Sequence, residues 1–528
     1  SLTGRLNFNG ENLLEKSPRQ LQKLRGKSIG MVFQEPMTAL NPVMPVGRQI
    51  AEVLTLHLGF PPKQAWAKAV ALLAETGIHE PETKARAYPF QLSGGQRQRA
   101  MIAMAVAAEP QLLIADEPTT ALDVAVQAQI LDLLARLQAE HQMTMLYITH
   151  DLNLVRRFAD DVAVMQGGRI VEQGSVADVF ARPQHDYTKM LLGIGARREV
   201  GAVPADAATV LAAEQISVAV SERVGWFKKR EKILLEPLSF DLKAGETLGI
   251  IGESGSGKTT LAKALMRLMP AKGRLNINGQ AWRPELRRAM QMVFQDPLGC
   301  MDPRFTVREL LAEPFAIHGV DVGDEVEALL HRVGLTPEHA NRRPHEFSGG
   351  QLQRIGIARA IALNPALVIC DEPVSALDVS VQAQVINLLC EIQEQSSLAY
   401  LFIAHDLSVV RHIADRVAVM YLGEIVEMAE VNELFTHPQH PYTRALLSAV
   451  PIPSPAAERA RTRIMLHSDA QDSACQAAPR QGCAFAPRCP VHAKLNPAQR
   501  AHCQQAVALR DIGTGGSSGG HLVRCAFA

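Results

Sequence analysis

The stretch Gly252-Glu253-Ser254-Gly255-Ser256-Gly257-Lys258-Thr259 decides the fold class of this 528-residue chain. It follows the apolar run 247–251 and precedes a segment with helical periodicity, which is the sequence context of a phosphate-binding loop. In such a loop, backbone N–H groups at a helix N-terminus point into a concavity, and glycines let the backbone approach a bound anion. We expect Lys258 to contact the β- and γ-phosphates of a nucleotide and Thr259 to bind Mg²⁺. The predicted nucleotide-binding residues are Gly252, Glu253, Ser254, Gly255, Ser256, Gly257, Lys258, Thr259 and Thr260.

Several other motifs occur twice, with a constant spacing of 255 positions (348 − 93 = 255). The first set comprises Ser93-Gly94-Gly95-Gln96, Asp116-Glu117-Pro118, Ala121-Leu122-Asp123 and His150. The second set comprises Ser348-Gly349-Gly350-Gln351, Asp371-Glu372-Pro373, Ala376-Leu377-Asp378 and His405. A repeat of this length indicates two copies of one nucleotide-handling domain in tandem.

The first copy has no phosphate-binding loop in this sequence. Residues 4–7 match residues 273–276 at an offset of 269 (273 − 4), so the counterpart of Gly252 would fall at 252 − 269 = −17. A parallel α/β sheet that lacks the strand and helix of its phosphate loop leaves a large apolar face open. We therefore expect the chain to begin inside a domain, as a truncated or frame-shifted sequence rather than a natural short form.

Short apolar strands alternate with helical segments in the second copy. Residues 366–370 are predicted as a strand, 379–393 as a helix and 399–405 as the next strand. This alternation predicts parallel βα units and an α/β fold. The paired acidic residues and the histidine of the second set follow strand ends, where α/β sheets place their ligands.

Two carboxylates and a helix N-terminus are expected to bind Mg²⁺, activate a water molecule and bind phosphate. Asp371 closes a predicted strand and suits a ligand of Mg²⁺, while the adjacent Glu372 can orient and deprotonate an attacking water as a general base. Each Ser-Gly-Gly-Gln segment opens a predicted helix, whose first N–H groups are unpaired and can bind a phosphate. An ordinary helix cap would also place a serine at this position.

At about 150 residues per domain, the length suggests three or four units, and the repeat resolves them into four parts. These are a first copy at 1–198, an Ala-rich linker at 199–215, a complete second copy at 216–450 and a cysteine-rich tail at 451–528. The second copy is expected to open with strands at 216–220 and 233–242.

Composition argues against some functions. Lys+Arg and Asp+Glu both number 54 and 5% of residues are aromatic, which argues against extensive nucleic-acid contact. No apolar stretch approaches the roughly 18 residues of a membrane span. Five of the eight cysteines crowd the C-terminus, and in a nucleotide-using protein this points to metal before disulfides. They are Cys475, Cys483, Cys489, Cys503 and Cys525.

The phosphate loop, Gln295, both Ser-Gly-Gly-Gln segments, both Asp-Glu pairs and His405 together resemble the ATP-binding cassette ATPases. The resemblance covers nearly the whole chain. It implies two tandem cassettes, each with a RecA-like core and a helical subdomain, the first of them N-terminally truncated. In that family the cassettes face each other head to tail, and each ATP lies between one phosphate loop and the opposite Ser-Gly-Gly-Gln segment.

The resemblance implies one complete ATP site and one degenerate site. The complete site would combine Lys258, Thr259, Gln295, Asp371, Glu372 and His405 with Ser93, Gly94, Gly95 and Gln96. Within it, Glu372, His405 and Gln295 would be catalytic, and Thr259, Gln295 and Asp371 would hold Mg²⁺. The degenerate site would combine Gln34, Asp116, Glu117 and His150 with Ser348, Gly349, Gly350 and Gln351, without a phosphate loop.

A segment after each copy resembles the C-terminal extension of dipeptide, oligopeptide and nickel importer ATPases. These segments are Pro-Gln-His-Asp-Tyr-Thr at 183–188 and Pro-Gln-His-Pro-Tyr-Thr at 438–443. The fused layout resembles the glutathione-type and microcin/peptide-type ATPases. This implies two transmembrane permease subunits docked near Gln34 and Gln295, an extracytoplasmic substrate-binding protein, and a peripheral place on the cytoplasmic face of the inner or plasma membrane.

The tail resembles that of several peptide-importer ATPases, in which four thiolates hold a [4Fe–4S] cluster. The matching residues are Cys483, Cys489, Cys503 and Cys525. Thiolates suit iron–sulfur clusters or zinc, and the spacing alone does not choose between them. An iron–sulfur cluster, a zinc ion and unligated thiols therefore remain open.

Two other functions and one local assignment also remain open. A tandem-cassette ATPase acting on ribosomes is an alternative, because one such family carries iron–sulfur centres, and an inactive truncated product is another. Neutral charge, few aromatic residues and the C-terminal position of the cysteines weigh against the ribosomal alternative. Trp226 and Phe227 are candidates either for stacking on adenine or for surface or membrane-adjacent packing. The basic cluster beside them, 228–230, is expected in a solvated loop rather than in contact with lipid.

Overall fold

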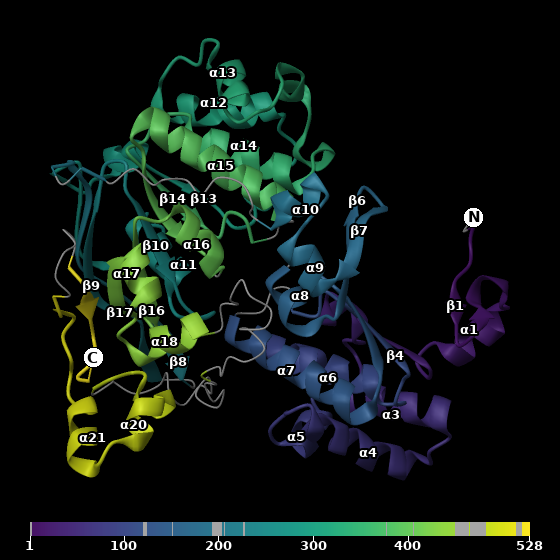
Figure 1. The fold of residues 1–528 in the computed structure, drawn as a ribbon. Coiled ribbons are helices and arrows are strands. Elements are labelled where there is room, and N and C mark those ends of the chain that lie inside the picture. The colour runs from purple at the N-terminus through teal and green to yellow at the C-terminus, as the bar shows by residue number, and fades with distance from the viewer. Residues whose placement is uncertain are drawn as a thin grey trace. The chain divides into compact units, whose positions relative to one another are not determined.

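The computed structural model describes residues 3–119, 124–149, 152–192, 203–204, 206–224, 228–375, 377, 379–404, 406–448, 464, 482–513 and 520–527. These residues pack into two compact units. The first unit comprises residues up to Gln184, and the second comprises the described residues from His185 onward, including the tail (Figure 1).

The second unit is built on an eight-stranded sheet with the order β13-β14-β15-β10-β16-β17-β19-β18. The first five strands in this order are parallel, and β17, β19 and β18 continue the sheet with antiparallel pairing. The strands are β13 (Met290–Val293), β14 (Leu367–Asp371), β15 (Ala399–Ile403), β10 (Thr247–Ile251), β16 (Arg416–Tyr421), β17 (Glu424–Glu430), β19 (Leu522–Val523) and β18 (Arg510–Asp511). The parallel α/β fold predicted from the strand–helix alternation is thereby confirmed for this unit.

Both faces of the parallel sheet are buried, and alternate residues of each strand enter different cores. In β15, Tyr400 and Phe402 pack into one core while Leu401 and Ile403 pack into the other. All four side chains are fully buried. This explains why the strand appears in the sequence as a continuous apolar run instead of an alternating pattern.

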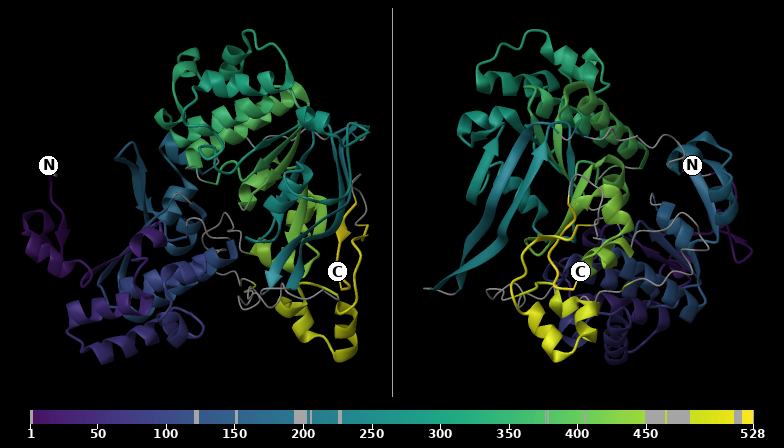
Figure 2. Two further views of the ribbon diagram at one scale, coloured as in Figure 1. Left: turned by 180° about the vertical axis from the view of Figure 1, so that it is seen from behind. Right: turned by 60° about the vertical axis from the view of Figure 1, so that its left-hand side comes forward.

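Most of the helices pack on one face of this sheet, while a second sheet and the helix Lys258–Leu265 pack on the other. The second sheet is antiparallel, with the order β12-β11-β8-β9, and its long teal strands form a layer of their own in both views of Figure 2. Its strands are β12 (Gln280–Ala281), β11 (Lys272–Ile277), β8 (Thr209–Val224) and β9 (Lys228–Lys243). The helices are α10 (Asp186–Leu191), α11 (Lys258–Leu265), α12 (Val307–His318), α13 (Glu325–Arg332), α14 (Gly349–Ile361), α15 (Val379–Ser396), α16 (Leu407–Ile413), α17 (Val431–Thr436) and α18 (Pro441–Ser448).

Strand β8 corrects the predicted linker at 199–215. The strand begins at Thr209 and pairs with β9 and β11, so residues 209–215 belong to the antiparallel sheet. Leu211 and Ala213 are buried there. Alanine is a weak strand former, and the Ala-rich segment therefore gave no strand signal, although its small side chains suit the packed layer.

Strand β9 corrects the assignment of the basic cluster 228–230. These residues lie in the strand and pair with residues 222–224 of β8, so they are not in a loop. Trp226 and Phe227, the candidates for adenine stacking, lie outside the described residues.

The first unit repeats part of this plan. Its parallel sheet has the order β3-β4-β5, matching β13-β14-β15, and β6 and β7 form a separate antiparallel pair. The strands are β1 (Asn7–Phe8), β2 (Glu11–Asn12), β3 (Ile29–Val32), β4 (Leu112–Asp116), β5 (Thr144–Ile148), β6 (Asp161–Gln166) and β7 (Arg169–Ser175). The helices are α1 (Pro18–Leu24), α2 (Pro36–Ala39), α3 (Val46–Leu58), α4 (Pro62–Glu75), α5 (Pro81–Ala85), α6 (Gly94–Val106), α7 (Val124–His141), α8 (Leu152–Phe158) and α9 (Val176–Ala181).

The described part of the first unit has no strand in the position that β10 fills between β15 and β16. Leu146 and Ile148 of β5 are 52% and 45% exposed, whereas Leu401 and Ile403, at the same positions in β15, are 0% exposed.

The tail folds against the second unit. Strand β19 pairs with β17, and two short helices follow Cys489, namely α20 (Pro490–Lys494) and α21 (Pro497–Cys503). Among the described helices, none combines the length and apolar character needed to cross a membrane.

Candidate functional site

The phosphate loop of the second unit joins the buried strand β10 to helix α11, as the sequence predicted. Two of its glycines are required because neighbouring atoms approach the backbone closely and because φ is positive there. A Cβ at Gly252, whose φ is +154°, would lie 2.2 Å from the Met420 carbonyl oxygen. At Gly257, with φ +104°, it would lie 2.9 Å from Leu235. The left-handed region and the lack of space together restrict these positions to glycine.

Lys258 lies folded over its own loop. Its Nζ donates to the Gly252 carbonyl oxygen at 2.8 Å and to the Glu253 carbonyl oxygen at 3.0 Å. The side chain is only 6% exposed, so the ammonium sits inside the concavity that the loop forms. This is where a cation is needed to bind nucleotide phosphates.

Thr259 and Asp371 meet although 112 positions separate them. Thr259 Oγ1 donates to Asp371 Oδ1 at 3.1 Å, which joins the start of α11 to the end of β14. Hydroxyl and carboxylate oxygens are the ligands that Mg²⁺ prefers, so this pair fits the ion. When bound, Mg²⁺ would neutralise charge on the nucleotide phosphates.

Burial raises the pKa of Asp371 above its ordinary value, against the hydrogen bond from Thr259, and the Glu372 charge raises it further. An ionised Asp371 therefore costs folding free energy at neutral pH, and this cost disappears as the pH falls and the carboxyl is protonated.

We expect Asp371→Asn to raise the Tm of the nucleotide-free chain at pH 7, by roughly 2–4 °C for each kcal/mol gained, because the amide has no charge to desolvate and its Oδ1 can still accept from Thr259. The same variant should bind Mg·ATP more weakly because it loses a carboxylate ligand. Thermal unfolding with and without Mg·ATP measures both effects. An unchanged or lower Tm without nucleotide, or a Tm gain that persists at acidic pH, would contradict this account.

Glu372 follows Asp371 directly and turns its side chain toward Gln295. Its φ is +48°, a left-handed conformation that is uncommon for a residue with a side chain. Gln295 Nε2 donates to Glu372 Oε2 at 2.9 Å, and the Glu372 N–H donates to the Ile403 carbonyl oxygen at 3.0 Å. The structure thus brings two of the three predicted catalytic residues, Gln295 and Glu372, together at the carboxyl end of the sheet. The third, His405, lies outside the described residues.

The first unit contains the same pair. Gln34 Nε2 donates to Glu117 Oε2 at 2.8 Å, and Glu117 has a φ of +43°. Asp116 ends strand β4 as Asp371 ends β14. His150 lies outside the described residues. The repeated strained backbone shows that both copies hold this carboxylate in the same way.

Both Ser-Gly-Gly-Gln segments begin helices with a capping box. In the first unit, Gln96 N–H donates to Ser93 Oγ at 3.3 Å, and in the second, Gln351 N–H donates to Ser348 Oγ at 3.4 Å. Each serine and the glycine after it are exposed. The second glycine serves packing, since a Cβ at Gly350 would lie 2.3 Å from Val381. Ordinary capping thus accounts for the serine hydroxyl and leaves the exposed helix start available to a ligand.

The segment 438–443 supports the phosphate loop through hydrogen bonds, a role that its sequence does not indicate. Buried Glu427 accepts from the N–H groups of Gln439 and His440, and His440 Nδ1 accepts from the Tyr442 N–H at 3.1 Å. Tyr442 Oη in turn accepts from the Glu253 N–H at 2.9 Å. A motif that marked the family branch in the sequence is therefore a hydrogen-bonded support for the loop.

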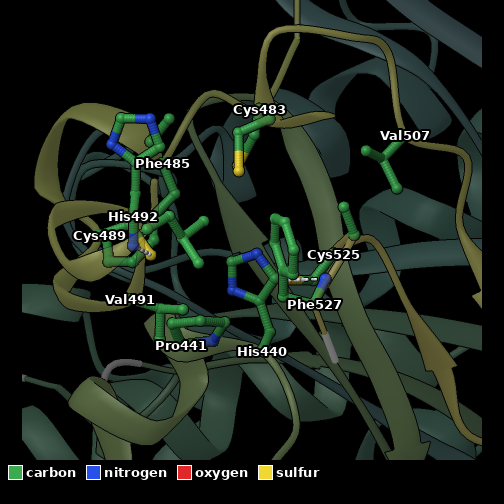
Figure 3. Close-up of a pocket in the computed structure, with 14 residues that line it drawn as sticks. His440, Pro441, Cys483, Phe485, Cys489, Val491, His492, Val507, Cys525 and Phe527 are labelled. Carbon is green, nitrogen blue, oxygen red and sulfur yellow. Dashed lines mark hydrogen bonds between the residues drawn. The ribbon is translucent and has the colours of Figure 1, made fainter. Parts of the chain in front are cut away.

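The four tail cysteines line one pocket, together with apolar side chains such as Phe485 and Val507 (Figure 3). Burial, with a contribution from the other three thiols, raises the pKa of Cys483 to about 11, and burial also raises the pKa of Cys503 and Cys525. Within the described residues, no three His, Cys, Asp or Glu side chains form a ready-made site for a metal ion. The fifth cysteine, Cys475, lies outside those residues.

A glycine-rich loop, a hydroxyl–carboxylate pair for Mg²⁺ and an adjacent glutamate define a nucleotide-hydrolysing site of the P-loop class. The ABC transporter family model matches residues 2–120 and 235–375, and the model of the oligopeptide/dipeptide transporter C-terminal region matches 171–197 and 426–494.

Curated relatives match most of the chain. The glutathione import ATP-binding protein GsiA of Salmonella typhimurium is 48% identical over 497 residues, which is 87% of this chain and 80% of that protein. The peptidoglycan transport ATP-binding protein YejF of Agrobacterium fabrum is 48% identical over 461 residues, 85% of this chain and 84% of that protein. A solved structure of the ATP-binding cassette MJ0796 with ADP and phosphate has 25% identity and a TM-score of 0.38, covering 42% of this chain and 98% of that one. The chain belongs to the ABC transporter ATPases, in the oligopeptide/dipeptide transporter family.

Proposed function

We propose that this chain is the ATP-hydrolysing subunit that energises a membrane importer of dipeptides, oligopeptides or a related cargo such as glutathione or nickel. The observation that carries the proposal is the Gln295–Glu372 hydrogen bond beside the Thr259–Asp371 pair, which joins a general base to a Mg²⁺ site. The names and coverage of the curated relatives support the importer assignment.

The ATP site is proposed to be composite. Lys258, Thr259 and Glu372 would act on one side of the nucleotide, and the exposed helix start at Ser93 and Gly94 would complete the site from the other copy. His405, Gly95 and Gln96 belong to the same proposal. A second site would pair Asp116 and Glu117, with Gln34 and His150, against residues 348–351.

Transport would follow from nucleotide-dependent closure of the two copies. ATP can shift the equilibrium only by as much as it binds the closed state more tightly than the open state. A site completed by residues of both copies has such a difference, because the second set of contacts exists only on closure. Two permease subunits, docked near Gln34 and Gln295 at the cytoplasmic face of the membrane, would move with the closure, and an extracytoplasmic binding protein would deliver the cargo.

Uptake of labelled dipeptides, longer peptides, glutathione and nickel in cells that carry wild type or Glu372→Gln tests this function. Loss of uptake of one class in the variant is the expected result and names the cargo. Uptake of every class at the wild-type rate would refute the importer assignment.

We further propose a [4Fe–4S] cluster at Cys483, Cys489, Cys503 and Cys525. Their shared pocket supports it, since the apolar lining would keep water from such a cluster. Each iron of a four-iron cluster takes one thiolate, so the ligands lie further apart than the four around a single zinc ion. Four cysteines around one pocket match the requirement of one thiolate for each iron.

Metal analysis of the chain purified without oxygen should find about four irons per chain, lost in Cys483→Ser because each thiolate holds one iron. Cys300→Ser is the control, since Cys300 does not line the pocket. Zinc in place of iron, or neither metal in the wild-type chain, would contradict the cluster.

A further inference from the structure

A buried arginine from the cysteine tail lies against the phosphate loop. Arg488 Nη1 donates to Glu253 Oε2 at 2.8 Å, and Nη2 donates to Glu253 Oε1 at 3.2 Å. Both side chains are 6% exposed. Two parallel N–H···O bonds between a guanidinium and a carboxylate fix the orientation of both groups as well as pairing their charges.

Two tyrosines hold this pair in place. Tyr442 Oη accepts from the backbone N–H of Glu253, so the same loop residue is held through its main chain and through its side chain. Arg488 Nη1 also donates to Tyr421 Oη at 3.4 Å, and its guanidinium carbon lies 5.9 Å from the centre of the Tyr421 ring. The contact is thus a buried ion pair held by further hydrogen bonds, not a surface ion pair.

Glu253 is an acidic residue within a loop whose ligand is an anion. A carboxylate there would repel nucleotide phosphates unless a cation neutralised it, because electrostatic interactions are weakly screened in a buried site. An arginine guanidinium stays protonated in proteins, so the two hydrogen bonds from Arg488 place that cation directly on the Glu253 carboxylate.

We propose that Arg488 is a positioning residue of the ATP site, which neutralises Glu253 and fixes the phosphate loop in the conformation that binds nucleotide. The proposal rests on the assignment of this loop as an ATP site. Arg488 ends the short 3₁₀ helix Ala486–Arg488 and is followed directly by Cys489, so the support for the loop comes from between two pocket cysteines. The ATP site therefore includes a part of the tail, far outside the motifs that define the cassette.

ATP affinity of the full chain, measured by titration calorimetry alongside kcat and KM, tests the proposal. Arg488→Met should weaken ATP binding roughly 10-fold and raise KM more than it lowers kcat. Combining it with Glu253→Gln should restore the affinity to within about threefold, because the repelling charge is gone as well. Arg500→Met is the matched control, because Arg500 is also a tail arginine but donates to the Ala493 carbonyl oxygen within the tail.

A purely structural role predicts a different pattern. If Arg488 only held the tail together, the double variant would bind ATP no better than Arg488→Met, and that result would overturn the proposal. Arg488→Lys keeps the positive charge but loses the bidentate hydrogen bonds, so it should lose less ATP affinity than Arg488→Met. Thermal unfolding curves check that both variants are folded. Equal affinity for all variants and wild type would also overturn the proposal, whereas a wild-type chain that binds no ATP would instead refute the ATP site itself.

Discussion

Glu372→Gln is expected to lower ATP turnover by about 10²- to 10⁴-fold while leaving ATP binding intact. The amide keeps the shape of the side chain, and its Oε1 can still accept the hydrogen bond that Gln295 donates at 2.9 Å. It cannot take a proton from the attacking water. Steady-state phosphate release and ATP titration on the same purified chain measure the two quantities separately.

Glu117→Gln is the control for this experiment, because Glu117 has the same backbone conformation and the same glutamine partner in the first unit. It should leave turnover at the site of Lys258 in place, since Glu117 belongs to the other proposed site. Turnover by Glu372→Gln at the wild-type rate would refute Glu372 as the base. Equal losses in both variants would show that the two copies share the chemistry.

Ser93→Arg is expected to lower turnover at the site of Lys258 by about 100-fold, although the two residues belong to different units. A long cationic side chain at the exposed start of α6 would fill the space that a nucleotide needs in a composite site. Loss of the capping box alone would cost only about 1 kcal/mol of stability.

Ser348→Arg separates these effects, because Ser348 caps α14 with the same hydrogen bonds as Ser93 caps α6. It should lose the same stability but much less turnover at the site of Lys258, since Ser348 lies in the same copy as Lys258 and would complete the other site. Similar turnover in Ser93→Arg and Ser348→Arg would contradict the head-to-tail pairing.

Local patterns were sufficient to predict the central strands and the residues at their ends. The strand before the phosphate loop has the predicted bounds, Thr247–Ile251, and Asp371 closes β14 as expected. Fully buried parallel strands and glycine-rich loops leave strong local signals, because burial on both faces demands a continuous apolar run. The family resemblance placed Gln295 and Glu372 in one site, and the hydrogen bond that joins them is a detail that only the structure supplies.

The support of the loop left no such signal. Tyr442 and Arg488 lie 189 and 235 positions from Glu253, and nothing in either local segment indicates the contact. The start of β8 was missed for a different reason, since its alanines are poor strand formers until a neighbouring layer buries them. Tertiary packing decides such positions, and a single sequence does not display it.

Because Glu253 and Arg488 neutralise each other, the residues at these two positions should covary during evolution. A chain that ended at Ser448 would keep the phosphate loop, Asp371 and Glu372, yet it would retain an acidic loop residue without its counter-ion. Natural relatives with a shortened tail should therefore carry an uncharged residue in place of Glu253, and relatives with the acid should keep the arginine. The two columns of a family alignment would then change together. The part of the chain that the ATP site needs would extend beyond the last cassette motif into the tail.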